Sequence, residues 1–195
     1  MGESDGMHMT LRSPLIAAAL LGALALPGST AAQTSAGDRC AGRDVVPNAK
    51  NIEQVEHATL CLVNEERTSR GLGRLTPVGS LQSVASAHAA RMVRHRFFEH
   101  TSPGGETFVA RIKRTGYLRW SVRRWSVGEN LAWGSGSRAT PASIVSAWMD
   151  SAGHRRNILD RDFDELGLGI ATGAPKAGVS GDAATYVNDF GERRR

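Results

Sequence analysis

The spacing of apolar residues predicts a series of helices in the first three quarters of the chain. The first begins near Asn51, where Asn51 followed by Gln54 is typical of a capping pair, and it ends at Gly71 and Gly73. A second helix is expected over residues 81–95. Its buried stripe is predicted to contain Leu81, Val84, Ala85, His88 and Met92.

Two shorter helices and three strands are expected farther along the chain. One helix covers about residues 106–116, and another starts at Thr140, a good N-cap that is followed by proline. Residues 126–133, 166–171 and 185–190 are predicted to form strands, the last two as an antiparallel hairpin around a glycine-rich loop. Helices that come first and strands that come late favour a mixed α/β (α+β) layer fold over a parallel βαβ sheet.

The N-terminal segment is typical of a secretory signal peptide. Residues 15–26 form an apolar run after Arg12, and small residues follow this run. Because a membrane span needs about 20 apolar residues, no transmembrane anchor is expected, and a retained anchor is the alternative. The sequence therefore predicts a signal peptide at 1–32, an N-terminal arm at 33–50 and a domain at 51–195. The protein is expected to be secreted, either extracellular or at the cell envelope.

Export changes how the two cysteines are interpreted. In an oxidising compartment Cys40 and Cys61 are expected to pair, which would tie the N-terminal arm to the first helix. The alternatives are two free thiols or a metal-binding pair, and neither cysteine belongs to the CxxC motif that is common in metal sites.

A formal net charge of +5 raises the question of nucleic acid as a partner. The arginines are scattered, and acidic residues lie among them. The densest basic segments, at residues 123–124 and 193–195, have no interleaved aromatic residues. No nucleic-acid partner is therefore expected, although the charge is compatible with weak attraction to anionic polymers of the cell surface.

Three segments combine a titratable side chain with a turn or a packing anchor. His100 follows two phenylalanines in FFEHTSP, Glu129 stands in GENLA, and His154 lies in GHRRNIL, just beyond the predicted helix end at Gly153. None of these segments is specific alone, because loop histidines are usually surface or hydrogen-bonding residues. His88, on the apolar stripe of the second helix, is expected to be a satisfied core residue.

Taken together and in this order, these segments resemble the CAP superfamily. The FxHTSP, GENLA and GHRxNIL segments precede a glycine-bounded strand and a YxxDFG-like end. They are similar to segments of cysteine-rich secretory proteins, insect antigen proteins, plant pathogenesis-related proteins and exported bacterial relatives. The resemblance covers residues 60–191 and implies an α-β-α sandwich, with a small, mainly antiparallel sheet between helical layers.

The resemblance also implies a cleft with two histidines and two acidic residues. By motif, the histidines are His100 and His154, and the first acid is Glu129. The family's second acid follows the tryptophan of the fourth helix, where this chain has Ser151, with Asp150 one residue before it. Further residues expected to line the cleft are Ser102, Asp150, Ser151, Asn157 and Trp133.

Two imidazoles and a carboxylate suit zinc or another divalent cation and leave a position for water. The favoured hypothesis is a secreted binding module whose His/Glu cleft binds a divalent metal, a lipid, a peptide or a cell-wall component. A metal-assisted, peptidase-like hydrolase is one alternative, although the chain has neither an HExxH helix nor a GxSxG elbow. A structural exported protein, with a polar cluster and no small-molecule chemistry, is the other.

Overall fold

A computed structural model describes residues 40–119, 122–179 and 181–194, so the predicted signal peptide lies outside the described residues. The helices are α1 (Ile52–Thr68), α2 (Gly79–His95), α3 (Phe108–Arg114), the 3-10 helix η2 (Gly136–Ala139), α4 (Pro141–Asp150) and α5 (Ala152–Ile158). The strands are β1 (Thr76–Pro77), β2 (Arg124–Ser135), β3 (Glu165–Thr172) and β4 (Ala183–Arg194). None of the described helices has the length and apolarity that a membrane crossing requires.

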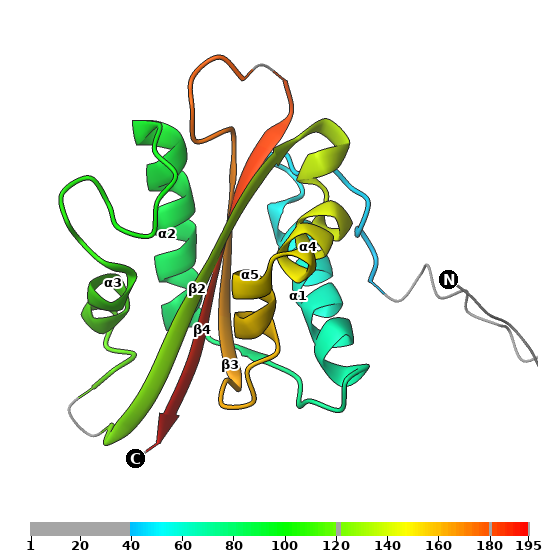
Figure 1. Ribbon diagram of the computed structural model, residues 1–195. Coiled ribbons are helices and arrows are strands. Elements are labelled where there is room, and N and C mark those ends of the chain that lie inside the picture. Colours follow the sequence, from blue (N-terminus) through cyan, green and yellow to red (C-terminus); the bar gives the residue numbers. More distant parts are fainter. Residues whose placement is uncertain (1–39, 120–121, 180, 195) are drawn as a thin grey trace, which may run out of the picture. The chain divides into compact units, whose positions relative to one another are not determined.

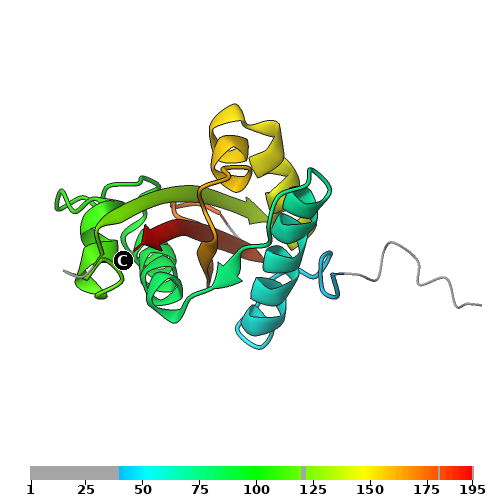
Figure 2. The same cartoon turned by 90° about the horizontal axis from the view of Figure 1, so that it is seen from below.

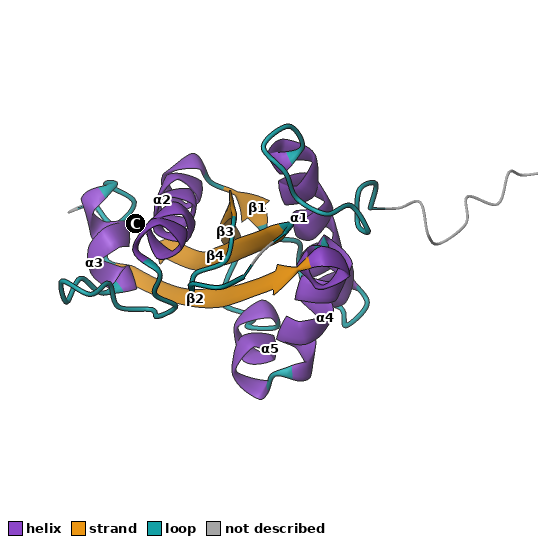
Figure 3. Ribbon diagram, turned by 90° about the horizontal axis from the view of Figure 1, so that it is seen from above, coloured by secondary structure: helices purple, strands orange, loops and turns teal. Residues whose placement is uncertain are grey.

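The strands form one four-stranded sheet in the order β1-β3-β4-β2. Strand β4 pairs antiparallel with both β2 and β3, which confirms the predicted hairpin, whereas β1 pairs parallel with β3 over two residues. Helices α2 and α3 cover one face of the sheet, and α1, α4 and α5 cover the other (Figure 1, Figure 3). The domain is therefore the mixed α/β layer fold that the pattern predicts, in the form of the α-β-α sandwich that the family resemblance implies.

Two glycines of β3 let α2 lie directly on the sheet. A Cβ atom on Gly167 would come within 2.1 Å of the Leu81 carbonyl carbon, and one on Gly169 within 2.0 Å of the Ser86 backbone nitrogen. A larger residue at either position would push the helix away, because packed interiors have no room to absorb such overlap. The view from below shows α2 close against the sheet (Figure 2). His88 of this helix is fully buried, as predicted.

The opposite face of the sheet carries the larger apolar cluster, in which Trp148 and Tyr186 pack edge to face. Arg67, near the end of α1, is buried beside this cluster. Its guanidinium donates hydrogen bonds to four backbone carbonyl oxygens, which belong to Gly73, Ile158, Asp160 and Phe163. A single side chain thus joins the end of α1 to the segment between α5 and β3.

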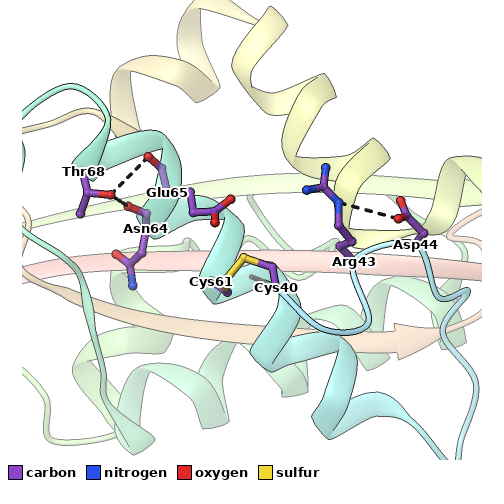
Figure 4. The surroundings of a disulfide bond; sticks show 7 residues. All are labelled: Cys40, Arg43, Asp44, Cys61, Asn64, Glu65 and Thr68. Carbon is purple, nitrogen blue, oxygen red and sulfur yellow. Dashed lines mark hydrogen bonds and ion pairs between the residues drawn. A yellow bond between two sulfur atoms is a disulfide. The ribbon is translucent and has the colours of Figure 1, made fainter. Parts of the chain in front are cut away.

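The two cysteines form the predicted disulfide. The Cα atoms of Cys40 and Cys61 lie 5.5 Å apart, and the two residues are separated by 21 positions in the sequence. The bond ties the segment that precedes α1 to the middle of that helix (Figure 4). Of the predicted N-terminal arm, residues 40–50 are described and residues 33–39 are not.

The capping pair predicted at the start of α1 is wrong. Asn51 is the N-cap residue, but its side chain makes no capping hydrogen bond. Its Oδ1 instead accepts from the backbone N–H of Asn48 at 2.7 Å, and its Nδ2 donates to the carbonyl oxygen of Val46. The preceding turn therefore uses the groups that a capping box would need. Thr140 does cap α4 as predicted, since its side chain accepts from the backbone N–H of Ser143.

The position predicted for His154 relative to the helices is also wrong. The chain leaves helical geometry at Ser151, which has φ −87° and ψ 121°, and becomes helical again at Ala152. His154 therefore lies within α5 and does not follow a helix end. Gly153, which the sequence pattern treats as a stop, is the second residue of this new helix.

Candidate functional site

The carboxylate of Glu129 is the centre of a buried polar cluster. Glu129 lies in β2, and its side chain is 0% exposed. Its Oε1 is 2.8 Å from Nδ1 of His100, and its Oε2 accepts from an Nη of Arg111 at 2.7 Å. Hydrogen bonds to an ionised group are the strong ones in proteins, and both oxygens of this carboxylate are engaged.

Arg111 of α3 also fixes the loop that carries His100. A second nitrogen of its guanidinium donates to the carbonyl oxygen of His100 at 2.9 Å and to that of Glu106 at 3.2 Å. The side chain is 3% exposed, so the positive charge has little access to water. No sequence signal distinguishes Arg111 from the other basic residues of its segment, such as Arg114, so its role is visible only in the structure.

Asp189 is a second carboxyl group that sequence reasoning missed. It lies directly opposite Glu129 in the pairing of β2 with β4, and it is fully buried. Neither oxygen has a hydrogen-bond donor among the described residues. Burial, and then the charge of Glu129, raise the pKa of Asp189 well above its ordinary value. The protonated form of Asp189 is therefore favoured by its surroundings.

His88 of α2 belongs to the same buried region. Its Nε2 lies 3.0 Å from the carbonyl oxygen of Glu99, so this nitrogen carries the proton and donates. Burial, and then the charge of Arg111, lower the pKa of His88. The ring is thus neutral, and it holds the start of the His100 loop against α2. The structure confirms its prediction as a core residue.

His154 approaches the same part of β2 from the opposite layer. The side chain of Asn130 donates to the carbonyl oxygen of His154 at 3.0 Å. Asn157, also in α5, donates to Oδ1 of Asn130 at 2.8 Å and to the carbonyl oxygen of Glu129 at 3.3 Å. Burial, and then the nearby His100, lower the pKa of His154, so its imidazole stays neutral near pH 7.

The other residues expected to line the cleft have different surroundings. Ser102 is buried and accepts a hydrogen bond from Arg91, Ser151 is the N-cap of α5, and Asp150 is exposed at the end of α4. The ammonium of Lys176 lies over the ring of Trp133, 4.9 Å from its centre. Asn157 alone among these five contacts the Glu129 segment by a hydrogen bond in the described part of the chain.

At this site the imidazoles are available as metal ligands, whereas the carboxylate of Glu129 is not. Both oxygens of Glu129 are taken by His100 and Arg111, and the ligand atoms of His100, Glu129 and His154 do not all lie within 4.8 Å of one another. The one group in the described ranges that meets this distance consists of Cys40, Cys61 and Glu65, and its sulfur atoms form the disulfide. The carboxylate of Glu129 is placed to orient the ring of His100, a common arrangement behind metal-binding histidines.

Comparison with known proteins agrees with the family resemblance over most of the chain. Residues 60–187 match the model of the CAP, or cysteine-rich secretory protein, family. The chain is 33% identical to the Bacillus subtilis protein YkwD over 119 residues, which are 61% of this chain and 43% of that protein. It is 28% identical to the Bacillus subtilis membrane protein YlbC over 115 residues, 59% of this chain and 31% of that protein. The chain therefore matches less than half the length of each.

Solved structures share the fold. An extracellular protein from Bacillus anthracis that contains an SCP domain superposes with a TM-score of 0.56 at 24% identity, over 75% of this chain and 44% of that one. An outer surface protein from Borrelia burgdorferi gives a TM-score of 0.59 at 22% identity, over 76% of this chain and 97% of that one. At these identities the likeness concerns the arrangement of helices and strands.

Proposed function

Because the chain belongs to the CAP family of cysteine-rich secretory proteins, we propose that it is an exported binding module that holds a divalent cation at His100 and His154. The cation would present the module to a lipid, peptide or cell-wall ligand outside the cell. The disulfide between Cys40 and Cys61 supports export, since such bonds persist in oxidising compartments.

One observation carries the proposal, which is the hydrogen bond between His100 and Glu129. Because Glu129 accepts at Nδ1, the proton of a neutral His100 ring resides there, and the lone pair of Nε2 is free to bind a metal. The side chain of His100 is 51% exposed, so this nitrogen is open to ions from solution. Imidazole nitrogens favour Zn²⁺ and Cu²⁺ among the divalent cations.

His154 supplies the second imidazole. The lowered pKa of His154 keeps its lone pair available near neutral pH, where a protonated histidine would repel a cation. The electrostatic influence of His100 on this ring supports the closeness of the two side chains. Two imidazoles leave the remaining coordination positions to water or to the ligand.

Calorimetric titration of the protein with Zn²⁺ tests the proposal. Wild-type protein is expected to bind one ion, and His100→Ala and His154→Ala are each expected to abolish measurable binding. Glu129→Gln keeps the shape of the side chain, and it should weaken binding by about tenfold or more, the usual cost of losing an orienting partner. His95→Ala is the matched control, because His95 is an exposed histidine at the end of α2.

Two results would overturn the proposal. Zinc binding that is equal in the wild type and in the double variant of His100 and His154 would remove the histidine pair as a metal site. Turnover of a peptide or ester panel by the zinc-loaded protein, lost in the double variant, would replace the binding function with that of a hydrolase.

A further inference from the structure

A small cavity lined by three arginines lies between α2 and α3. Its volume is about 150 Å³, and its arginines are Arg91 from α2 and Arg111 and Arg114 from α3. The remaining lining residues are Ser83, Val84, Ala87 and Thr115. No acidic residue belongs to this lining, although three guanidinium groups gather there.

The carboxylates that neutralise these arginines are too few. Glu106 accepts from Arg91 at 2.8 Å and from Arg114 at 2.7 Å, while Glu129 accepts from Arg111 at 2.7 Å. Three guanidinium groups therefore share two carboxylates, and one positive charge has no partner within this cluster. That charge belongs to Arg91 and Arg114, which share Glu106 and have side chains that are 35% and 65% exposed, whereas Arg111 has the carboxylate of Glu129 to itself.

The arginines also have unused hydrogen-bond donors. Glu106 engages a single nitrogen of Arg91 and a single nitrogen of Arg114, and a guanidinium carries five N–H groups. The Nε of Arg111 is buried and has no acceptor in the described part of the chain. Buried donors are nearly always paired in native proteins, so an unpaired one beside a cavity indicates a missing acceptor.

We infer that this cavity is a binding site for a phosphate group, held by Arg91 and Arg114 beside the buried charge of Arg111. The forked guanidinium matches two oxygens of a phosphate at once. Two such forks offer more N–H donors than the two oxygens of a carboxylate can accept, whereas the oxygens of a phosphate group can use them. The phosphate group could be free or could belong to a lipid or polymer of the cell envelope.

The phosphate site would lie next to His100 and would not depend on a metal ion there. Arg111 lines the cavity, and the same guanidinium contacts both Glu129 and the carbonyl oxygen of His100. An anion in the cavity would draw on the charge that now stabilises Glu129, so phosphate binding should be sensed at His100.

Titration with inorganic phosphate tests the inference, in low-salt buffer that contains EDTA, so that the proposed metal site plays no part. Isothermal calorimetry should show one saturable site. Arg114→Gln should weaken it by about tenfold, the effect of one lost hydrogen bond to a charged group. Ser83→Asp, which places a carboxylate at the cavity wall on an exposed helix position, should abolish it. Arg94→Gln, an exposed arginine of α2 that lines a different hollow, should bind as the wild type does.

Nuclear magnetic resonance gives a readout that does not depend on heat. Phosphate should shift the backbone signals of Ser83 and Thr115 and the ring signals of His100, and these shifts should be absent in Ser83→Asp. Circular dichroism of each variant checks that it is folded.

Vesicles of phosphatidylglycerol distinguish the sources of the phosphate group. Vesicles that bind the wild type and not Ser83→Asp would identify a lipid headgroup, and phosphate binding without vesicle binding would identify a free phosphate. Absence of saturable phosphate binding, or equal affinity in wild type, Arg114→Gln and Ser83→Asp, would overturn the inference.

Discussion

Replacing Asp189 by asparagine removes a proton that the native protein binds and the unfolded chain releases. Asp189 is fully buried opposite Glu129 in the sheet, and its pKa is raised by burial and by that neighbouring charge. Asparagine has almost the same shape and carries no ionisable proton. The substitution therefore keeps the packing and removes the titration.

The expected size follows from proton linkage. Between the ordinary pKa of 3.8 and the raised pKa of the native state, the folded protein holds one proton more than the unfolded chain at this site. Folding stability then falls by about 1.4 kcal/mol for each unit of rising pH, because the unfolded state binds fewer protons. This contribution to stability is complete below pH 3.8 and is lost as the pH rises through the native pKa. As the pH rises by two units within this window, the free energy of unfolding of Asp189→Asn should therefore increase relative to that of the wild type by roughly 3 kcal/mol.

Urea denaturation of both proteins at a series of pH values between 4.5 and 7.5 measures this difference. The raised pKa of Glu56 and the lowered pKa values of His88 and His154 also make stability depend on pH, but they are common to both proteins and cancel. Asp150→Asn, the same change at an exposed position, should give a curve parallel to the wild type. A parallel curve for Asp189→Asn would refute the reasoning, since it would mean that Asp189 is ionised in the native protein.

Three further substitutions test what holds the fold together. Arg67→Ala leaves four carbonyl oxygens without their donor and should lower the free energy of unfolding in urea by about 3 kcal/mol or more; a loss below 1 kcal/mol would contradict this. Cys61→Ser should cost about 3 kcal/mol of chain entropy, and a reducing agent should lower the melting temperature of the wild type to that of the variant. Gly169→Ala should cost about 1 to 3 kcal/mol by overlap with Ser86, whereas Gly153→Ala, with open space around it, should change stability by less than about 0.5 kcal/mol in the same assay.

The fold could be predicted from periodicity because most elements bury one regular face. The stripe of α2 and the pattern of β3 and β4 gave the correct element types, and export chemistry gave the disulfide. The additional helix α5 was missed because glycine, here Gly153, is typical of helix ends. The turn at Ser151, after which the new helix begins, has no local sequence signature. Strand β1 has two residues, which is too short to show any alternation.

The site was predicted only in part, for a different physical reason. Motifs located His100 and Glu129, which lie in hydrogen-bond contact although 29 positions separate them. Arg111 and Asp189 depend on contacts between distant segments, and spacing within one segment does not reveal those. One signal was available for Asp189, since a carboxylate in the interior of a predicted strand, followed directly by Phe190, must be paired or protonated if that strand is buried.

The surroundings of Glu129 separate the residues that stabilise the protein from those that can bind a ligand. Arg111 neutralises the carboxylate, Asp189 lies opposite it in the sheet, and both lie out of reach of water, so their replacement should act first on folding. His100 contacts the same carboxylate but is half exposed, and water can replace its hydrogen bond. A change at His100 should therefore alter metal binding with a small effect on stability, and a change at Arg111 should do the reverse. If both changes destabilised the protein equally, His100 would be one of the residues that stabilise the fold, and the proposed metal site would not be separable from the buried cluster around Glu129.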